Sequence, residues 1–296
     1  MKTKKTKSLK QTEFKYVALF TFPALFLLSY FMFQAMVLAF GFSLLNFNML
    51  KPKDAFFVGL ENYRRLFTDP TFYRALRNSI YFTFVVIIYQ IPLAFGLALL
   101  VRKKLRGVGI FRTAYFTPLV TSITVVSILW TFIYNPNPTQ GLLNAMIVKF
   151  GMKPSMFLHD PKSAMNAIIL MSGWHSAGRQ MMILLAGLQA IPEDLYEAAA
   201  IDGANAFGKF IHVTLPGIKN VMIFVVQITM ISAMKVFTQP YVMTQGGPKE
   251  STKTLTYFIY QQGFQFRNVG YASSISVLFF IIVVTISMLM KSLIKE

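Results

Sequence analysis

The segment IPEDLYEAAAIDGANAFGKFIHVTLP, residues 191–216, is a polar, helix-forming insert between two apolar stretches. Pro192 suits the first position of a helix, because that position needs no backbone donor. Glu193 and Asp194 complement the positive end of the helix dipole, and Gly203 supplies a C-terminal stop. The pattern therefore predicts a short helix that begins at Pro192 and ends before Gly203.

A second short helix is predicted from about Ala206 to Val213, ended by Pro216, which lacks a backbone donor. One side of the first helix repeats at helical spacing: Leu195, Ala198, Ala199 and Asp202. Small alanine side chains let another surface approach closely, so this helix fits the groove of a partner protein. An amphipathic element lying on the membrane surface explains the same pattern equally well.

The whole chain is too apolar for a soluble domain of its size. Of its 296 residues, 55% are hydrophobic and only 14% are charged, and the mean hydropathy is +0.53. Four uncharged stretches are each long enough to supply the roughly 20 residues that cross a bilayer. They are residues 16–50, 78–101, 113–148 and 268–290. Two further apolar stretches contain a cation, Arg179 in 164–190 and Lys235 in 217–238.

We therefore expect an all-α membrane protein with six transmembrane helices. The expected spans are about 16–45, 78–101, 113–134, 164–190, 217–238 and 268–290. Residues 1–15 should form a disordered basic tail in the cytoplasm, and residues 16–296 a single membrane domain. The 191–216 segment then becomes a cytoplasmic two-helix loop between the fourth and fifth spans.

Basic residues flank the spans and indicate their orientation. The formal net charge is +18, lysines crowd the tail, and five cations occupy the 102–112 connection. Cytoplasmic loops are enriched in such residues, so both termini should be cytoplasmic. The cations would then contact membrane lipid headgroups, and no nucleic acid partner is expected. The 51–77 connection is also basic, so the orientation depends mainly on the tail and the 102–112 connection.

Several short segments carry a family resemblance. Glu197-Ala198-Ala199, Gly203 and Val213-Thr214-Leu215-Pro216 resemble the EAA signature of the integral membrane subunits of binding-protein-dependent ABC importers, with Val213 where isoleucine is usual. Other segments are similar to the carbohydrate branch, whose members transport maltose, oligosaccharides or glycerol phosphate. They are LAGLQAIP at 185–192, TQGGP at 244–248, GLENY at 59–63 and GYAS at 270–273. The chain thus resembles a permease with the type I, MetI-like fold.

The resemblance implies a multi-pass subunit of a bacterial cytoplasmic (inner) membrane importer. Its partners would be a second six-span permease, two cytoplasmic ABC ATPases and an extracellular or periplasmic solute-binding protein. The residues expected to couple to the ATPase are Glu197, Ala198, Ala199, Asp202, Gly203, Leu215 and Pro216. Glu197 would contact the ATPase, and Gly203 would form the turn between the coupling helices. ATP and magnesium would be bound by the ATPase, so no cofactor is expected in this chain.

The sequence shows no enzyme active site. Residues 203–210, GANAFGKF, are similar to a phosphate-binding loop, but Phe210 stands where serine or threonine would ligate magnesium, and a helix instead of a strand is expected before it. His159, His175 and His212 belong to no catalytic motif. The chain contains no cysteine, so thiolate metal sites are excluded and no metal site is expected.

The cation Arg179 is expected near the middle of the fourth span. If it faced lipid it would cost about 2.5–3.5 kcal/mol, and no acidic residue lies in any expected span. It should therefore face a solute path or the second permease, unless the span is misplaced. The candidate path residues are Trp174, His175, Arg179, Gln180, Gln227 and Lys235. Gln227 could equally bond between helices, and Lys235 could extend to the membrane interface.

The predicted function is that of a permease that forms, with its partner, the path of a sugar delivered by the external binding protein. An oligosaccharide is expected, and the cations Arg179 and Lys235 hint that it is anionic. The alternatives are an ion-coupled secondary transporter, a membrane-embedded enzyme, and an ABC permease for a non-sugar solute such as glycerol phosphate. A secondary transporter would normally show membrane carboxylates or a repeat, and an enzyme would show a catalytic cluster.

Overall fold

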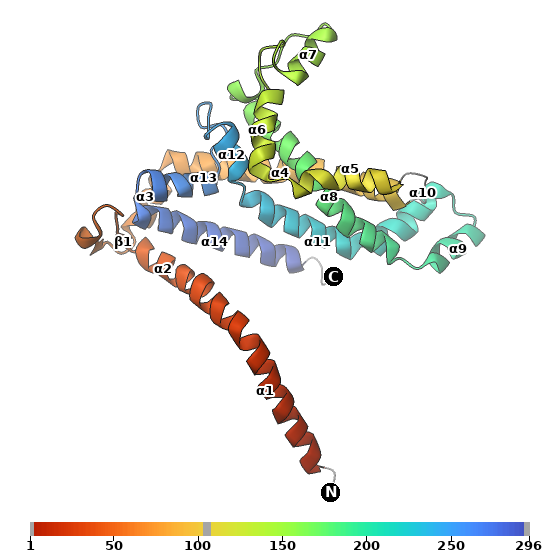
Figure 1. Cartoon of the computed structure of the whole chain (residues 1–296), viewed down its shortest axis with the longest axis horizontal. Coiled ribbons are helices and arrows are strands. Elements are labelled where there is room, and N and C mark those ends of the chain that lie inside the picture. The colour runs from red at the N-terminus through yellow and green to blue at the C-terminus, as the bar shows by residue number, and fades with distance from the viewer. Residues whose placement is uncertain (1–2, 103–107, 293–296) are drawn as a thin grey trace. The chain divides into compact units, whose positions relative to one another are not determined.

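The computed structural model describes residues 3–102 and 108–292, and this part of the chain is mostly helical (Figure 1). The predicted helical fold class is therefore confirmed, apart from one sheet of two short strands. The chain divides into two compact units. The first comprises residues 1–68 and 261–278, and the second comprises residues 69–260 and 279–296.

A long helix opens the first unit. It consists of α1 (Thr3–Leu28), the π-helical turn η1 (Ser29–Phe33) and α2 (Gln34–Ser43). The helix extends into the basic tail as far as Thr3, which corrects the expected disorder of residues 1–15 from Thr3 onward. Lysine and glutamine are good helix formers, so a helix begun in the apolar stretch can continue through them. The most apolar window of this helix contains no buried residue.

The rest of the first unit contains a small sheet and several short helical elements. Strand β1 (Leu45–Asn46) pairs antiparallel with β2 (Phe56–Phe57), and the 3-10 turn η2 (Pro52–Asp54) lies between them. Helix α3 (Glu61–Thr68), the π-helical turn η5 (Gln261–Gln265) and the first part of α14 (Val269–Ser292) complete it. The guanidinium carbon of Arg65 lies 4.4 Å from the centre of the Tyr271 ring, and this cation–π contact holds α3 against α14.

Three long helices form the core of the second unit: α4 (Pro70–Arg102), α8 (Ala164–Gln189) and α11 (Leu215–Met234). Figure 1 shows α8 and α11 running side by side. Glycine lets them approach closely, because a Cβ added at Gly187 of α8 would lie 2.9 Å from the Val221 side chain of α11. Small-residue contacts of this kind are typical of helices packed in membranes.

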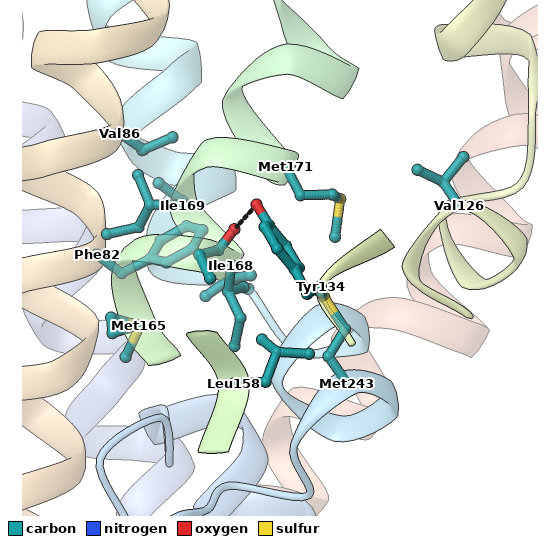
Figure 2. Close-up of a cluster of buried hydrophobic side chains, with 13 residues drawn as sticks. Phe82, Val86, Val126, Tyr134, Leu158, Met165, Ile168, Ile169, Met171 and Met243 are labelled. Atoms are coloured by element: carbon teal, nitrogen blue, oxygen red, sulfur yellow. Dashed lines mark hydrogen bonds between the residues drawn. The ribbon is translucent and has the colours of Figure 1, made fainter. Parts of the chain in front are cut away.

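A buried apolar cluster joins α8 to the segments that flank it (Figure 2). Tyr134 is only 1% exposed, and its hydroxyl donates a hydrogen bond to the Ala167 carbonyl at 2.9 Å. Figure 2 shows Leu158, Met171 and Met243 close to the tyrosine ring. The cluster draws on the 3-10 turn η3 (Phe157–His159) and on α12 (Thr238–Met243) as well as α8. Helices α7 (Leu142–Lys149) and α13 (Leu255–Tyr260) also belong to this unit.

The third expected span, 113–134, is not one helix. Helices α5 (Val108–Val120) and α6 (Ile123–Ile133) meet at a break formed by Thr121 and Ser122. Ser122 has a φ of −55° and a ψ of 130°, which is extended backbone that interrupts the helical hydrogen bonds. Pro118 in the last turn of α5 weakens the helix just before the break, because it has no backbone donor.

Within the described residues, four helices are long and apolar enough to cross a membrane. They are Tyr16–Ser43, Pro70–Arg102, Ala206–Met243 and Val269–Met290. These correspond to the first, second, fifth and sixth expected spans. Helix α8 matches the fourth in position, but its polar side chains lower its hydropathy, and the break between α5 and α6 shortens the third. The count of six spans therefore stays a prediction.

Candidate functional site

A cavity of about 270 Å³ lies within the second unit, bordered by α4, α8, α11 and the residues that follow α11. Four of the predicted path residues line it: His175, Arg179, Gln180 and Lys235. Further polar side chains also line it: Gln90, Ser172, Ser176, Thr229, Ser232, Thr238 and Gln239. The polar face of α8 therefore faces this cavity.

Two predicted path residues are engaged elsewhere. The Trp174 ring lies 5.5 Å from the Trp130 ring, centre to centre, and Trp174 is not among the residues that line the cavity. Gln227 donates from Nε2 to the Ser287 carbonyl at 3.4 Å, so it bonds between α11 and α14. Trp174 and Gln227 thus contact other helices within the described chain.

Three side chains at the cavity hold buried polar atoms that have no hydrogen-bond partner within the described chain. They are Nε2 of Gln90, Oγ of Ser172 and Oε1 of Gln180. The other amide atom of Gln180, Nε2, donates to Oγ1 of Thr229 at 3.2 Å, which fixes the side chain in the cavity wall. Because an unpaired buried polar group costs free energy, these atoms favour a polar occupant such as solute hydroxyl groups or water.

The helix break lies beside the cavity. His175 places its Nε2 3.3 Å from the carbonyl oxygen of Thr121, the residue that follows α5. Ile123, the first residue of α6, lines the cavity. A broken helix frees backbone groups that lipid cannot satisfy, so such breaks are tolerated where they are buried in protein or line a solute site. His175 therefore borders the cavity and also contacts a backbone carbonyl at the helix break.

The segment 191–216 contains a first helix, α9 (Glu193–Ile201), that ends as the sequence predicts. Gly203 has a φ of +78°, which an L side chain rarely adopts. Its N–H donates to the Ala200 carbonyl at 3.1 Å, and the N–H of Ala204 donates to the Ala199 carbonyl at 2.8 Å. This pair of bonds is the Schellman motif, which closes a helix around a left-handed residue.

The remainder of the segment corrects two predictions. Pro192 precedes α9 as its N-cap and is not its first residue. After α10 (Ala206–Lys209), the π-helical turn η4 (Phe210–Thr214) runs directly into α11, so Pro216 does not end a helix. Pro216 lies at the start of α11, where the missing donor is tolerated next to the wider π-helical turn.

The predicted coupling residues are accessible. Glu197, Ala198, Asp202, Gly203, Leu215 and Pro216 are exposed, and Ala199 is half-buried. Figure 1 shows α9 beyond the shared end of α8 and α11. Helix α9 buries none of its residues and carries two acidic side chains, Glu193 and Asp194, in its first turn. Its surface is therefore available for contact with another protein or with a membrane surface.

One contact that sequence reasoning missed holds α9 in place. Arg102, the last residue of α4, donates to the hydroxyl of Tyr196 at 2.9 Å. The same hydroxyl lies 3.0 Å from Oγ1 of Thr214, at the end of η4. Tyr196 also packs against the apolar cluster of α4, α8 and α11. The one available signal was an aromatic residue inside an otherwise polar insert.

A charged network fixes the loop that follows α12. Glu250 accepts a hydrogen bond from Lys253 at 2.6 Å and pairs with Arg74 of α4. The amide of Asn78 donates to the backbone carbonyls of Glu250 and Lys253, at 2.8 and 3.0 Å. The hydrogen bond from Lys253 and the charges of Lys253 and Arg74 hold the pKa of Glu250 below its ordinary value.

Comparison with known proteins agrees with this architecture. Residues 90–295 match the family described as binding-protein-dependent transport system inner membrane component. The chain is 36% identical over 257 residues to the probable ABC transporter permease protein YurN of Bacillus subtilis (strain 168), covering 86% of this chain and 87% of YurN. It is 35% identical over 277 residues to the arabinooligosaccharides transport system permease protein AraP of the same organism, covering 93% and 88%.

A solved structure shows the same fold. The chain is similar to one from a bacterial ABC transporter involved in the import of the acidic polysaccharide alginate, with a TM-score of 0.84 and 22% identity over 98% of this chain and 97% of that chain. The resemblance to the membrane subunits of binding-protein-dependent ABC importers is thus confirmed by the sequence comparisons, and the fold agrees with it. The chain belongs to the family of binding-protein-dependent transport system inner membrane components, the membrane permeases of ABC importers.

Proposed function

We propose that this permease forms, with a second six-span permease, the path of a carbohydrate of oligosaccharide size across a bacterial cytoplasmic membrane. The observation that carries the proposal is the polar cavity between α4, α8 and α11, in which buried atoms of Gln90, Ser172 and Gln180 have no partner within the described chain. Sugar hydroxyl groups both donate and accept hydrogen bonds, so they can satisfy such a wall. A relative that covers most of the chain, AraP, is named for arabinooligosaccharides.

The proposed topology has six spans and both termini in the cytoplasm. Four long apolar helices support four of the spans. We add α5 with α6 as the third span, because a break that lines a solute cavity is tolerated in a membrane. We add α8 as the fourth, because its 26 residues are long enough and its polar side chains face the cavity instead of lipid.

The segment 191–216 is the proposed coupling element. It would dock on one of two cytoplasmic ATPases through α9, with Glu197 and the half-buried Ala199 at the contact and Gly203 setting the angle to the following helix. Binding and hydrolysis of ATP with magnesium would take place in the ATPases, and an external binding protein would deliver the sugar. This chain then moves its helices without performing chemistry itself.

Small phosphate esters are a second candidate class of solute. Arg179 and Lys235 line the cavity, and a small phosphate ester such as glycerol phosphate would also satisfy two cations. The ion-coupled secondary transporter is disfavoured, because the chain belongs to a binding-protein-dependent family.

The test is transport by the complete importer in proteoliposomes, with ATP inside the lumen that represents the cytoplasm. Uptake of at least one labelled oligosaccharide, from a panel of neutral and acidic ones, should require ATP and the binding protein. Glu197→Lys should abolish the stimulation of ATP hydrolysis by the liganded binding protein, whereas Lys149→Gln, on the exposed end of α7, should not change it. Uptake of glycerol phosphate with no uptake of any oligosaccharide would overturn the carbohydrate proposal.

A further inference from the structure

We propose that the sugar which passes through this cavity carries an anionic group, a carboxylate or a phosphate or sulfate ester, recognised by Arg179 and Lys235. The inference rests on the proposed function, in which the cavity of the second unit is the sugar path. It deepens that function by naming the charge of the substrate. Its basis is the balance of charges around the cavity.

Among the described residues, no acidic side chain lines the cavity, although the cations Arg179 and Lys235 do. In the part of the chain that the structure describes, Glu61 and Glu250 form ion pairs with basic side chains, and neither residue lines the cavity. The sequence contains no acidic residue between Asp160 and Glu193, or between Asp202 and Glu250. The helices that carry the two cations therefore supply no counter-charge, and an anionic occupant would supply it.

Arg179 carries most of this inference. It lies inside α8, away from either helix end, so no helix dipole explains its position. Its side chain is exposed and lines the cavity, which leaves the guanidinium free to contact a solute. A guanidinium presents several donors in a planar fork that matches the two oxygens of a carboxylate or phosphate.

Lys235 adds a second cation on a different element. It is the C-cap of α11, where the negative end of the helix dipole already favours a positive charge. The helix dipole alone therefore explains a lysine at this position, without an anionic solute. Together with Arg179 it gives the cavity a charge of two without a compensating acid among the lining residues.

Neutral groups beside Arg179 complete the recognition site. Gln90 Nε2 is a buried donor with no partner in the described chain, and Ser172 Oγ can donate as well. Both residues line the same cavity as Arg179. These donors suit anionic oxygens or sugar hydroxyl groups, so one bound sugar acid could satisfy the cation and the unpaired amide together.

The deciding experiment measures solute binding to the assembled complex of both permeases and the ATPases, without the binding protein, by equilibrium dialysis. Omitting the binding protein ensures that the cavity alone is measured. The probes are trigalacturonate, the neutral galactotriose of the same linkage, galactose 6-phosphate and inorganic phosphate. We expect at least one anionic sugar to bind at least about tenfold more tightly than galactotriose, with affinity that falls as salt concentration rises.

Variants assign the effect to the two cations. Arg179→Gln should weaken binding of the anionic sugar about tenfold and leave galactotriose unchanged, whereas Arg179→Lys should retain part of the affinity. Lys149→Gln removes an exposed cation outside the cavity and should change nothing. If Arg179→Gln prevents assembly, Lys235→Gln provides the same comparison from α11, with a selective loss for the anionic sugar expected.

The outcomes separate this inference from the proposed function. Equal binding of galactotriose and the anionic sugars, or equal weakening of both by Arg179→Gln, would overturn the anionic substrate while leaving a sugar importer intact. Inorganic phosphate binding as tightly as the sugars would overturn the joint recognition of charge and sugar. Absence of binding and of uptake for every sugar would overturn the proposed function and the inference with it.

Discussion

Arg102 and Tyr196 form a cation–π pair that is also hydrogen-bonded: the guanidinium carbon lies 4.6 Å from the ring centre, and the guanidinium donates to the hydroxyl at 2.9 Å. The pair joins the end of α4 to α9, and the Thr214 hydroxyl extends it to η4. The Tyr196 side chain of α9 thus contacts both α4 and η4. If α9 contacts the ATPase, this pair is the direct route by which its displacement reaches α4.

The first prediction therefore concerns Tyr196. Tyr196→Phe should keep the ring over Arg102 and lose hydrogen bonds worth about 0.5–1.5 kcal/mol each, so coupling should fall only partly. Tyr196→Ala should lose the ring contact too, worth about 0.5–2 kcal/mol, and uncouple α9 more fully. Both should be measured as ATP hydrolysis stimulated by the liganded binding protein in reconstituted complexes.

The control is Leu25→Ala. Leu25 lies on α1, outside the segment 191–216, and its side chain is 56% exposed. ATPase attachment should survive in all three variants, which separates coupling from assembly. Full stimulation and full transport in Tyr196→Ala would show that the pair only stabilises the fold.

Gly203 gives the second prediction. A Cβ at this position meets no atom within 4 Å, so a substitution is opposed by the backbone alone. Because φ is +78°, Gly203→Val should cost about 1–3 kcal/mol and shift α9 relative to α10. We expect membrane insertion to be retained and ATPase attachment or stimulation to fall.

Asparagine provides the comparison at this site, because it adopts left-handed backbone more readily than valine. Gly203→Asn should stay closer to the wild type in ATPase attachment. Equal loss in both variants would point to the volume of the side chain instead of the backbone conformation, and wild-type behaviour in both would remove the turn from the coupling mechanism.

Local signals explain which parts of this site the sequence could predict. The end of α9 depends on residues within one helical turn of Gly203, so it is visible in the sequence. The Arg102–Tyr196 bond spans 94 residues, and no local pattern specifies it. The same limit applies to Pro216, since no local sequence pattern predicts the π-helical turn that precedes it.

The cavity, too, contains some residues that a local sequence pattern indicates and others that it does not. Polar residues inside an apolar helix led to the prediction of a solute path along α8, and Arg179 and Gln180 line the cavity. Trp174 is close to them in sequence but its ring packs on Trp130. Adjacent residues of a helix point in directions about 100° apart, so closeness in sequence does not place two side chains on one face. Gln90 could not be predicted as a cavity residue, because a lone amide in α4 is equally consistent with helix packing.

The third prediction tests the orientation. The chain contains no cysteine, so single cysteines can be introduced without background. A cysteine at Lys209, on α10, should be shielded from an impermeant thiol reagent added outside, whereas one at Asn137, in the exposed connection after α6, should react. Labelling of the Lys209 position from outside in sealed, correctly oriented vesicles would contradict both the topology and the coupling role.

The last prediction concerns acid sensitivity at Glu250. The hydrogen bond from Lys253, with the charges of Lys253 and Arg74, lowers the pKa of Glu250 in the folded chain below the ordinary value of 4.5. A group whose pKa is lowered by folding stabilises the fold above its unfolded pKa, and this contribution is lost as pH falls through the folded pKa. The loop after α12 should therefore loosen below a pH of 4.5.

Glu250→Gln removes the titrating group and keeps a similar shape, so the variant should be less stable than the wild type at neutral pH and should lose less stability on acidification. Thermal unfolding of the purified permease across this pH range measures both differences. Asp54→Asn, which removes an exposed carboxylate of η2 that is not part of the network, serves as the control and should follow the wild-type pH dependence. Parallel pH profiles for the wild type and Glu250→Gln would show that the network with Arg74 and Lys253 does not stabilise the loop.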